Sequence, residues 1–231
     1  NLPPGTYTFK ATTACNPSLV LPASITAYSV TANEFVLSPH CGSFDLYVKH
    51  TSTGVAFAGF WLQRKNEVTG KWEHPETGVE YVDGATPDIL SSYTLGNNTT
   101  NFSLIMPGGE YRVLKSFQTW ASGTKAAKIC IEELYEFTYY DHLEIAGIEI
   151  ISCSGEVLAD VMVNVVGVPP FTYTITEKNN LPFVIANGEN NVFEDLESAL
   201  YLVEVTDDCG EKRQELFNIA DLPTPVFALK P

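Results

Sequence analysis

Basic residues are scarce in this sequence of 231 residues: 13 lysines and arginines stand against 28 aspartates and glutamates, a formal net charge of −15. A surface this negative repels phosphate backbones and anionic lipid head groups. The sequence also lacks a run of about 18 apolar residues, the length that a membrane-spanning helix needs. We therefore expect neither nucleic-acid binding nor membrane insertion.

Catalytic and metal-binding motifs are missing as well. The histidines form no His-Glu-x-x-His pattern and the cysteines no Cys-x-x-Cys pattern, so no zinc site is predicted. Neither a Gly-x-Ser-x-Gly nucleophile elbow nor a Gly-x-x-x-x-Gly-Lys-Ser/Thr phosphate loop occurs. We expect no enzyme activity and no bound cofactor.

The residues that are abundant favour β-structure. Only 18% of the residues are charged, whereas 11 tyrosines, 13 phenylalanines, 16 glycines and 14 prolines are spread along the chain. This composition is typical of short strands joined by turns. We predict an all-β protein made of tandem antiparallel Ig-like β-sandwich domains. Residues 129–140 contain three glutamates that could line a helix, but they end in Phe-Thr-Tyr-Tyr, and we predict a strand there.

One segment recurs along the chain. Residues 1–15 align without a gap on residues 195–209, and in both a tyrosine is followed by alternating apolar residues and then a cysteine. A third copy begins at Met106, and its Cys130 follows Tyr111 at a longer distance, which predicts an extended hairpin. Alternation with a period of two indicates a half-buried strand. Each copy is therefore predicted to be a late strand of a β-sandwich.

The repeats divide the chain into predicted domains. An alternating apolar strand follows Cys41 and another follows Cys153, as at the start of a domain. We predict the last strands of a truncated repeat plus a linker at 1–29, an Ig-like sandwich at 30–139, a second sandwich at 140–224, and the start of another linker at 225–231.

The five cysteines follow the same division. We predict the disulfides Cys41–Cys130 and Cys153–Cys209, each joining a first strand to a late strand, with Cys15 unpaired. Matched placement in separate copies favours an oxidising compartment, although reduced, buried thiols are the alternative.

The last predicted domain resembles a known family. It combines Cys-Ser-Gly at 153–155, Gly-Val-Pro-Pro-Phe-Thr-Tyr at 167–173 and Tyr-Leu-Val-Glu-Val-Thr-Asp-Asp-Cys-Gly at 201–210. This combination resembles the SprB-type repeat, which builds large cell-surface adhesins of gliding Bacteroidetes exported by the type IX secretion system. The middle domain, with segments 60–66 and 69–75, is similar to longer Ig-like modules of the same surface proteins.

The resemblance implies a non-catalytic segment of a secreted adhesin, outside the cell and associated with the outer membrane through its parent protein. It would serve as an extended spacer or stalk in surface attachment and gliding motility. The implied partners are neighbouring repeats of the same chain and the secretion and gliding machinery; a part in that machinery itself is a further interpretation. Pro-containing linkers at 19–23 and 222–225, together with the disulfides, would keep the array extended under load.

The alternative function is that of a carbohydrate-binding module of a secreted enzyme, which could contact surface polysaccharide. Trp72, next to a hairpin signal at 69–71, and Tyr81 are the candidate glycan contacts. Packing in the core or in a turn is the competing interpretation of both. Trp61, between Phe60 and Leu62, is expected to be the core anchor of its strand.

Calcium is the one metal that the sequence suggests, because junctions between extracellular domains can bind it through carboxylates. A solvated acidic surface is the favoured alternative, since none of the candidates follows an Asp-x-Asp-x-Asp-Gly loop. The candidates are Glu189, Glu194, Asp195 and Glu197 before the last repeated strand, and Asp207 and Asp208 after it. Three Asn-x-Ser/Thr matches, at Asn97, Asn98 and Asn101, are interpreted as loop residues.

Overall fold

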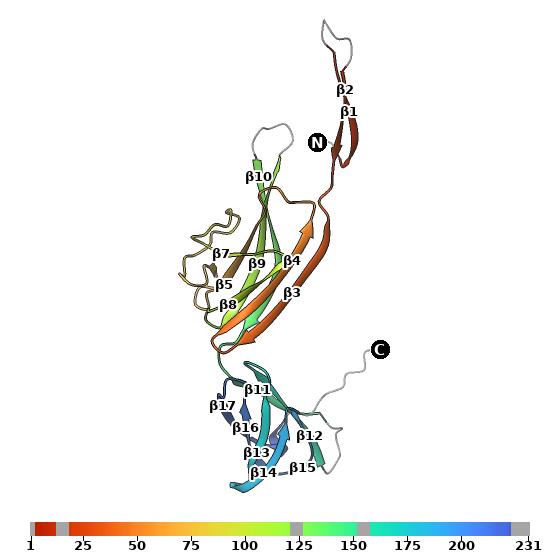
Figure 1. Cartoon of the computed structure of the whole chain (residues 1–231). Coiled ribbons are helices and arrows are strands. Elements are labelled where there is room, and N and C mark those ends of the chain that lie inside the picture. The colour runs from red at the N-terminus through yellow and green to blue at the C-terminus, as the bar shows by residue number, and fades with distance from the viewer. Residues whose placement is uncertain (1–2, 13–18, 121–126, 152–157, 223–231) are drawn as a thin grey trace. The chain divides into compact units, whose positions relative to one another are not determined.

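The computed structural model describes residues 3–12, 19–120, 127–151 and 158–222 (Figure 1). These residues form strands β1 to β17 and one short 3-10 helix, and no α-helix occurs among them. Every strand pair with an assigned register is antiparallel. The prediction of an antiparallel all-β fold is confirmed. No helix in the described part of the chain is long and apolar enough to span a membrane.

The chain divides into two compact units. The first contains residues 1–37, 46–102 and 109–138, and the second contains residues 38–45, 103–108 and 139–231. The second unit therefore includes the turn at residues 41–42 and the connection at residues 105–108, together with the strand ends next to them. Each unit is described separately.

The first unit contains two larger sheets. One has the order β10-β9-β5-β6, with β7 also paired to β5, and the other has the order β3-β4-β8. The strands are β3 (Val30–His40), β4 (Ser43–Ser52), β5 (Gly59–Lys65), β6 (Trp72–Glu73), β7 (Tyr93–Leu95), β8 (Thr99–Leu104), β9 (Gly109–Trp120) and β10 (Ala127–Tyr139). The strand predicted at residues 129–140 is β10, which is the neighbour of β9 in the sheet, as expected for the extended hairpin.

Alternating burial explains how the strands of the first unit form. On β4, Leu46, Val48 and His50 are buried while the residues between them are half-buried. On β5, Phe60 and Leu62 are buried on one face. Since successive side chains of a strand point to opposite faces, each sheet presents one apolar face for packing.

A two-stranded sheet precedes these strands. β1 (Gly5–Ala11) pairs only with β2 (Leu19–Ile25) among the described residues. The proline-containing linker predicted at residues 19–23 is wrong, because all five residues pair with β1. The prediction overlooked that proline is tolerated on an edge strand, where its missing N–H leaves no ladder partner unpaired.

The second unit is a two-sheet sandwich. One sheet has the order β11-β12-β15 and the other β14-β13-β16-β17. The elements are β11 (Glu144–Ile150), β12 (Leu158–Val166), β13 (Thr172–Lys178), β14 (Leu181–Gly188), β15 (Val192–Glu197), β16 (Leu200–Thr206), β17 (Lys212–Asn218) and the 3-10 helix η1 (Ile219–Asp221).

The core of the second unit lies between its two sheets. Val161, Val163 and Phe193 come from the three-stranded sheet, and Ile175 and Val203 come from the four-stranded one. All five are at most 1% exposed. Burial of these alternating apolar side chains at roughly 25 cal/mol per Å² is the main favourable contribution to the stability of the unit.

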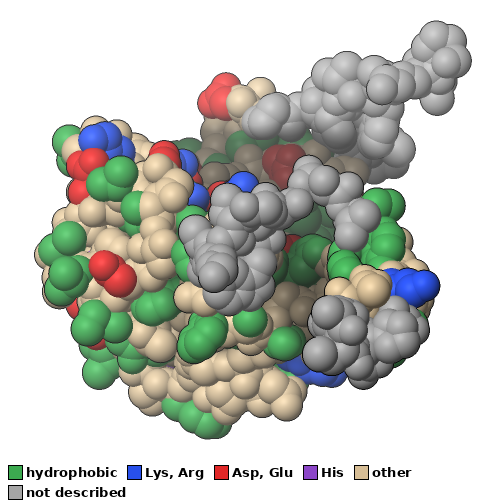
Figure 2. Space-filling model, turned by 90° about the horizontal axis from the view of Figure 1, so that it is seen from above, with side chains coloured by type: hydrophobic (Ala, Val, Ile, Leu, Met, Phe, Trp, Pro, Cys, Tyr) green, Lys and Arg blue, Asp and Glu red, His purple; other side chains and the backbone are tan. Residues whose placement is uncertain are grey.

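Apolar side chains also reach the surface. On the face that Figure 2 presents, hydrophobic groups lie at several separate places, with acidic and basic groups between them. Phe9, Leu21, Phe57, Phe102 and Val184 are each more than half exposed. Single exposed apolar residues are ordinary in folded proteins, so only those gathered on one face of an element indicate a binding surface.

Candidate functional site

The candidate glycan residues meet around one arginine in the first unit. Trp72 on β6 is half-buried, and the guanidinium carbon of Arg112 on β9 lies 4.3 Å from the centroid of its ring. The same guanidinium carbon lies 5.4 Å from the ring centroid of Tyr81. The two aromatic residues are thus brought together by cation–π contacts with Arg112, a residue that the sequence analysis did not single out.

Buried hydrogen bonds position this arginine. Arg112 Nε donates to Gln63 Oε1 at 2.8 Å, and Gln63 Nε2 donates to Ser92 Oγ at 2.8 Å. Gln63 and Ser92 are both fully buried. On the other side, Arg112 Nη1 lies 3.1 Å from a carboxylate oxygen of Glu133. Because its donors have fixed partners, Arg112 holds one orientation beside Trp72.

Trp72 opens onto a shallow groove with a volume of about 220 Å³. The groove combines an aromatic ring with the carboxylates of Glu110 and Glu136. Burial, and then the nearby charge of Glu133, raises the pKa of the Glu136 carboxyl group. A ring face beside hydrogen-bonding carboxylates can stack on a sugar and accept bonds from its hydroxyl groups. The remaining lining residues are Tyr111, Phe137 and Thr138.

The other aromatic candidates do not face this groove. Tyr81 is only 4% exposed and its hydroxyl donates to the carbonyl oxygen of Ala85, so its assignment as an exposed glycan contact is wrong. Trp61 is also not the core anchor of β5: Phe60 and Leu62 fill the core, while Trp61 lies half-buried on the opposite face. Its Nε1 donates to Ser116 Oγ at 2.9 Å.

A second cavity in the first unit contains a buried lysine. It has a volume of about 390 Å³ and is lined by Lys115, Ser52, His50 and Asn97 together with apolar residues. Lys115 is 2% exposed, and its ammonium donates a hydrogen bond to Ser52 Oγ. The ammonium nitrogen also lies 4.7 Å from the ring centroid of Phe117 and 5.3 Å from that of Tyr28. The cation–π attraction to these aromatic faces offsets part of the free-energy cost of removing the ammonium from water.

Lys115 is expected to make stability depend on pH. Burial lowers the pKa of its ammonium from 10.5. Since the unfolded chain then binds more protons than the folded one between the two pKa values, the free energy of unfolding rises with pH across this window, by at most about 1.4 kcal/mol per pH unit. Urea unfolding of Lys115→Met at pH 7 to 10 should show that this rise has been lost.

Lys49 provides the matched control. A hydrogen bond to Glu34 raises the pKa of the exposed Lys49 ammonium, so its contribution is present below pH 10.5 and is lost as the pH rises through the folded-state pKa. Between pH 7 and 10 this contribution is constant, so Lys49→Met should leave the pH dependence in that range unchanged. An unchanged pH profile for Lys115→Met would show that Lys115 is not buried in solution.

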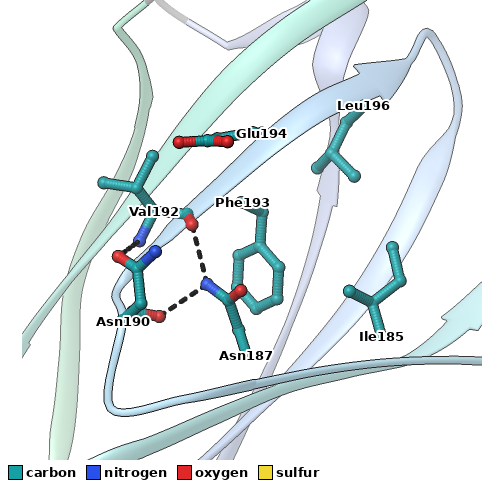
Figure 3. A pocket seen from close by; sticks show the side chains of 7 residues that line it. All are labelled: Ile185, Asn187, Asn190, Val192, Phe193, Glu194 and Leu196. Carbon is teal, nitrogen blue, oxygen red and sulfur yellow. Dashed lines mark hydrogen bonds between the residues drawn. The ribbon is translucent and has the colours of Figure 1, made fainter.

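A third hollow, of about 190 Å³, lies in the second unit (Figure 3). Asn187 Nδ2 donates to the carbonyl oxygens of Asn190 and Val192, both at 2.7 Å, and Asn190 Oδ1 accepts a bond from Val192 N. These amide groups close the turn between β14 and β15. The polar groups of this hollow are therefore used to hold the backbone.

The asparagines of two of the Asn-x-Ser/Thr matches also hold the backbone. Asn97 exchanges two hydrogen bonds with the backbone of His50. Asn101 Nδ2 donates to the carbonyl oxygens of Leu46 and Gly96. The assignment of Asn101 to a loop is wrong, since it lies in β8. Both amides fix β8 and the turn before it to β4.

A disulfide joins Cys41 to Cys209 within the second unit, with the two Cα atoms 5.6 Å apart. Each cysteine lies at a hairpin turn and precedes a glycine with positive φ, Gly42 at 74° and Gly210 at 76°. Asp207 supports the second turn, because its carboxylate accepts the N–H of Glu211 at 2.8 Å.

This bridge corrects the predicted pairing. Cys41–Cys130 and Cys153–Cys209 are both wrong, because Cys41 and Cys209 pair with each other and Cys130 is a free thiol. Cys130 lies on β10, where its Sγ is 3.6 Å from Thr119 Oγ1. Cys15 and Cys153 lie outside the described residues.

The acidic candidates for calcium do not converge. Glu197 pairs with Lys178 at 2.6 Å, Asp207 holds its own turn, and Asp195 N donates to Asp160 Oδ1 at 3.0 Å. In the part of the chain that the structure describes, no three His, Cys, Asp or Glu side chains are grouped to hold a metal ion. No protein-family model, curated protein or solved structure matches this chain.

Proposed function

We propose that this chain is a non-catalytic segment of a large secreted cell-surface adhesin, in which β-sandwich units arranged in tandem serve as a spacer for surface attachment and gliding. The observation that carries the proposal is the Cys41–Cys209 disulfide. Structural disulfides persist in oxidising surroundings and are rare in reducing ones, which favours a location outside the cell. The resemblance to SprB-type repeats supports the same location.

Two further properties support a spacer. The fold is nearly all antiparallel β-structure, in which each strand is held laterally by its neighbours. The net charge of −15 makes neighbouring molecules repel one another, which suits a dense surface layer. This function requires two kinds of partner: the neighbouring repeats of the same chain, and the machinery for secretion and gliding.

Surface proteolysis of intact source cells tests the proposed location. We expect protease added to the cells to release peptides of this chain, with Cys41 and Cys209 recovered in one disulfide-linked pair under non-reducing mass spectrometry. A cytosolic marker protein should stay intact in the same experiment. Recovery of the chain only after cell lysis, with both thiols free, would overturn the proposal.

A pulling experiment tests the mechanical role. Because the disulfide closes a loop with a sequence separation of 168 residues, this part of the chain cannot extend while the bond is intact. At about 3.5 Å per residue, reduction should add about 590 Å to the fully unfolded length between the termini. Single-molecule extension with and without reductant measures this difference, and equal lengths would show that the bridge does not form.

Glycan binding is the second candidate function, and the groove beside Trp72 favours it. The half-buried ring and the carboxylates of Glu110 and Glu136 line a groove of about 220 Å³, and Arg112 lies over the ring. Stacking of one sugar on an indole ring contributes about 1 kcal/mol or more. This function would make the segment adhesive itself, or place it in a carbohydrate-binding module.

A glycan array with purified chain tests this candidate. If the groove binds a polysaccharide, Trp72→Ala should weaken saturable binding about 10-fold or more. Phe102→Ala is the control, because Phe102 belongs to the same unit and is 71% exposed but does not line the groove. If both variants bind as well as the unmodified chain, or if the unmodified chain binds no glycan, the groove is excluded as a glycan site.

A further inference from the structure

The β1–β2 hairpin carries an uncovered apolar face. Phe9 pairs with Leu21 and Ala11 pairs with Leu19, so these side chains lie on one face of the hairpin, which we call the open face. Phe9, Leu19 and Leu21 are 52%, 50% and 51% exposed. An isolated two-stranded sheet is marginally stable in water. A hairpin with such a face is therefore expected to pack against another sheet or another protein surface.

The second unit contains the same hairpin. In β1–β2, Tyr7 pairs with Ala23, and in β16–β17, Tyr201 pairs with Phe217; both members of the pair differ by 194 residues. The same difference relates the Phe9–Leu21 pair to Val203–Glu215. A single offset therefore aligns both strands and their register, which the sequence repeat alone showed only for the first strand.

A side-chain hydrogen bond is also shared. Tyr7 Oη donates to the carbonyl oxygen of Pro3 at 2.5 Å, and Tyr201 Oη donates to that of Glu197 at 3.1 Å. Both acceptors lie four residues before the tyrosine and are related by the same offset. A tyrosine that bonds back to the backbone at the entrance of a late strand is a feature of sandwich domains. The two hairpins are therefore the same structural element.

In the second unit the part of this face that β16 and Phe217 form is covered, whereas Arg213 and Glu215 of β17, which correspond to Leu19 and Leu21, are exposed. Tyr201, Val203, Val205 and Phe217 are at most 5% exposed and belong to one core with Val161, Val163, Phe193 and Leu196 of β12 and β15. In addition, β16 pairs with β13 along its second edge. Among the described residues, β1 has neither a covering sheet nor a second strand partner.

We propose that β1–β2 is the final hairpin of a preceding β-sandwich, and that its open face packs against an apolar sheet built like β11-β12-β15. The free edge of β1 then pairs with a strand that corresponds to β13. The inference rests on the proposed function, because it takes the preceding sandwich to be another repeat of the same polypeptide.

The covering strands are expected in cis rather than from a second copy of this chain. In the second unit β12, β13 and β15 all precede β16, and β15 ends at Glu197, three residues before β16 begins at Leu200. A connection this short places the covering sheet directly before the hairpin in the sequence. By the same order, the sheet that covers β1–β2 is encoded immediately before it.

Hydrogen exchange in two chains tests the proposal. One is the chain of 231 residues, and the other is extended toward its N-terminus by the sequence that precedes it in the mature protein. We expect the amides of β1 and β2 to exchange about 100-fold more slowly in the extended chain, because the hairpin becomes part of a packed sandwich. Equal exchange in the two chains, or a mature protein that begins at Asn1, would overturn the proposal.

Two substitutions on opposite faces of the hairpin give the matched comparison. Phe9→Ser places a hydroxyl on the open face and should remove most of the added protection, about 10-fold or more. Val20→Ser is the control: Val20 is 53% exposed, pairs with Lys10 and lies on the opposite face, so protection should change less than about twofold. Equal effects of the two substitutions would contradict packing of the open face.

Analytical ultracentrifugation of the 231-residue chain tests whether a second copy of the chain, rather than a preceding sheet, covers the open face. A dimer that Phe9→Ser dissociates and Val20→Ser does not would assign the open face to a second copy and overturn the proposal; a monomer supports it. The location experiment is independent of this one. If the chain is exposed on the cell surface but the amides of β1 and β2 are not protected in the extended chain, the proposed function stands and only the docking of the hairpin is refuted.

Discussion

Loss of the Cys41–Cys209 disulfide is expected to lower the free energy of unfolding by about 5 kcal/mol. The bond closes a loop with a sequence separation of 168 residues, and in the chain-entropy model a longer loop restricts the unfolded ensemble more. The effect should appear as a large decrease in the urea midpoint of the second unit when the chain is reduced. Urea titration followed by circular dichroism measures it.

Two cysteine-to-serine variants provide the controls for this prediction. The double variant Cys41→Ser/Cys209→Ser should unfold at the low midpoint with or without reductant. Cys130→Ser should keep the high midpoint, because Cys130 is a free thiol on β10. If Cys130→Ser instead removes the response to reductant, the original pairing of Cys41 with Cys130 would be correct and the bridge described above would not form.

Truncation of Phe193 is expected to have the next largest effect, a loss of about 3–5 kcal/mol in the free energy of unfolding. Phe193 on β15 is 1% exposed and pairs with Val161 of β12 in the core of the second unit. Phe193→Ala removes a ring whose space the two sheets cannot close, so the lost burial and the cavity both contribute. Chemical denaturation of the oxidised chain measures the loss.

Leu216→Ala is the comparison for Phe193→Ala. Leu216 belongs to β17 of the same unit but is 56% exposed, so its truncation should change the free energy of unfolding by about 0.5 kcal/mol or less. Similar losses for both variants would indicate that the two sheets do not enclose the core described here. The disulfide stays intact in both, which separates packing from the covalent contribution.

Much of the local structure could be predicted from the sequence. The alternation of Phe44, Leu46 and Val48 identifies β4, and the pattern of residues 129–140 identifies β10 in spite of its glutamates. The repeat of residues 1–15 at 195–209 identifies β1 and β16 as the same strand. These predictions succeed because a strand is recognised by a period of two within a few residues.

The candidate site could be predicted only in part. Trp72 was identified from a hairpin signal next to it, but Arg112, which lies over its ring, is 40 residues away in the sequence and gave no signal. Lys115 was missed for the same reason. Nothing within β9 distinguishes a lysine that faces Tyr28 and Phe117 from one that faces solvent.

The amino-acid sequence by itself determined the all-β class, the positions of several strands and the repeat of one strand, because these depend on residues that are close together in the chain. Only the tertiary structure decided that Cys41 pairs with Cys209, that Arg112 meets Trp72 and that Lys115 is buried. These contacts depend on which strands become neighbours. That choice is made by the packing of whole sheets, and the alternation within a single strand is compatible with many partners.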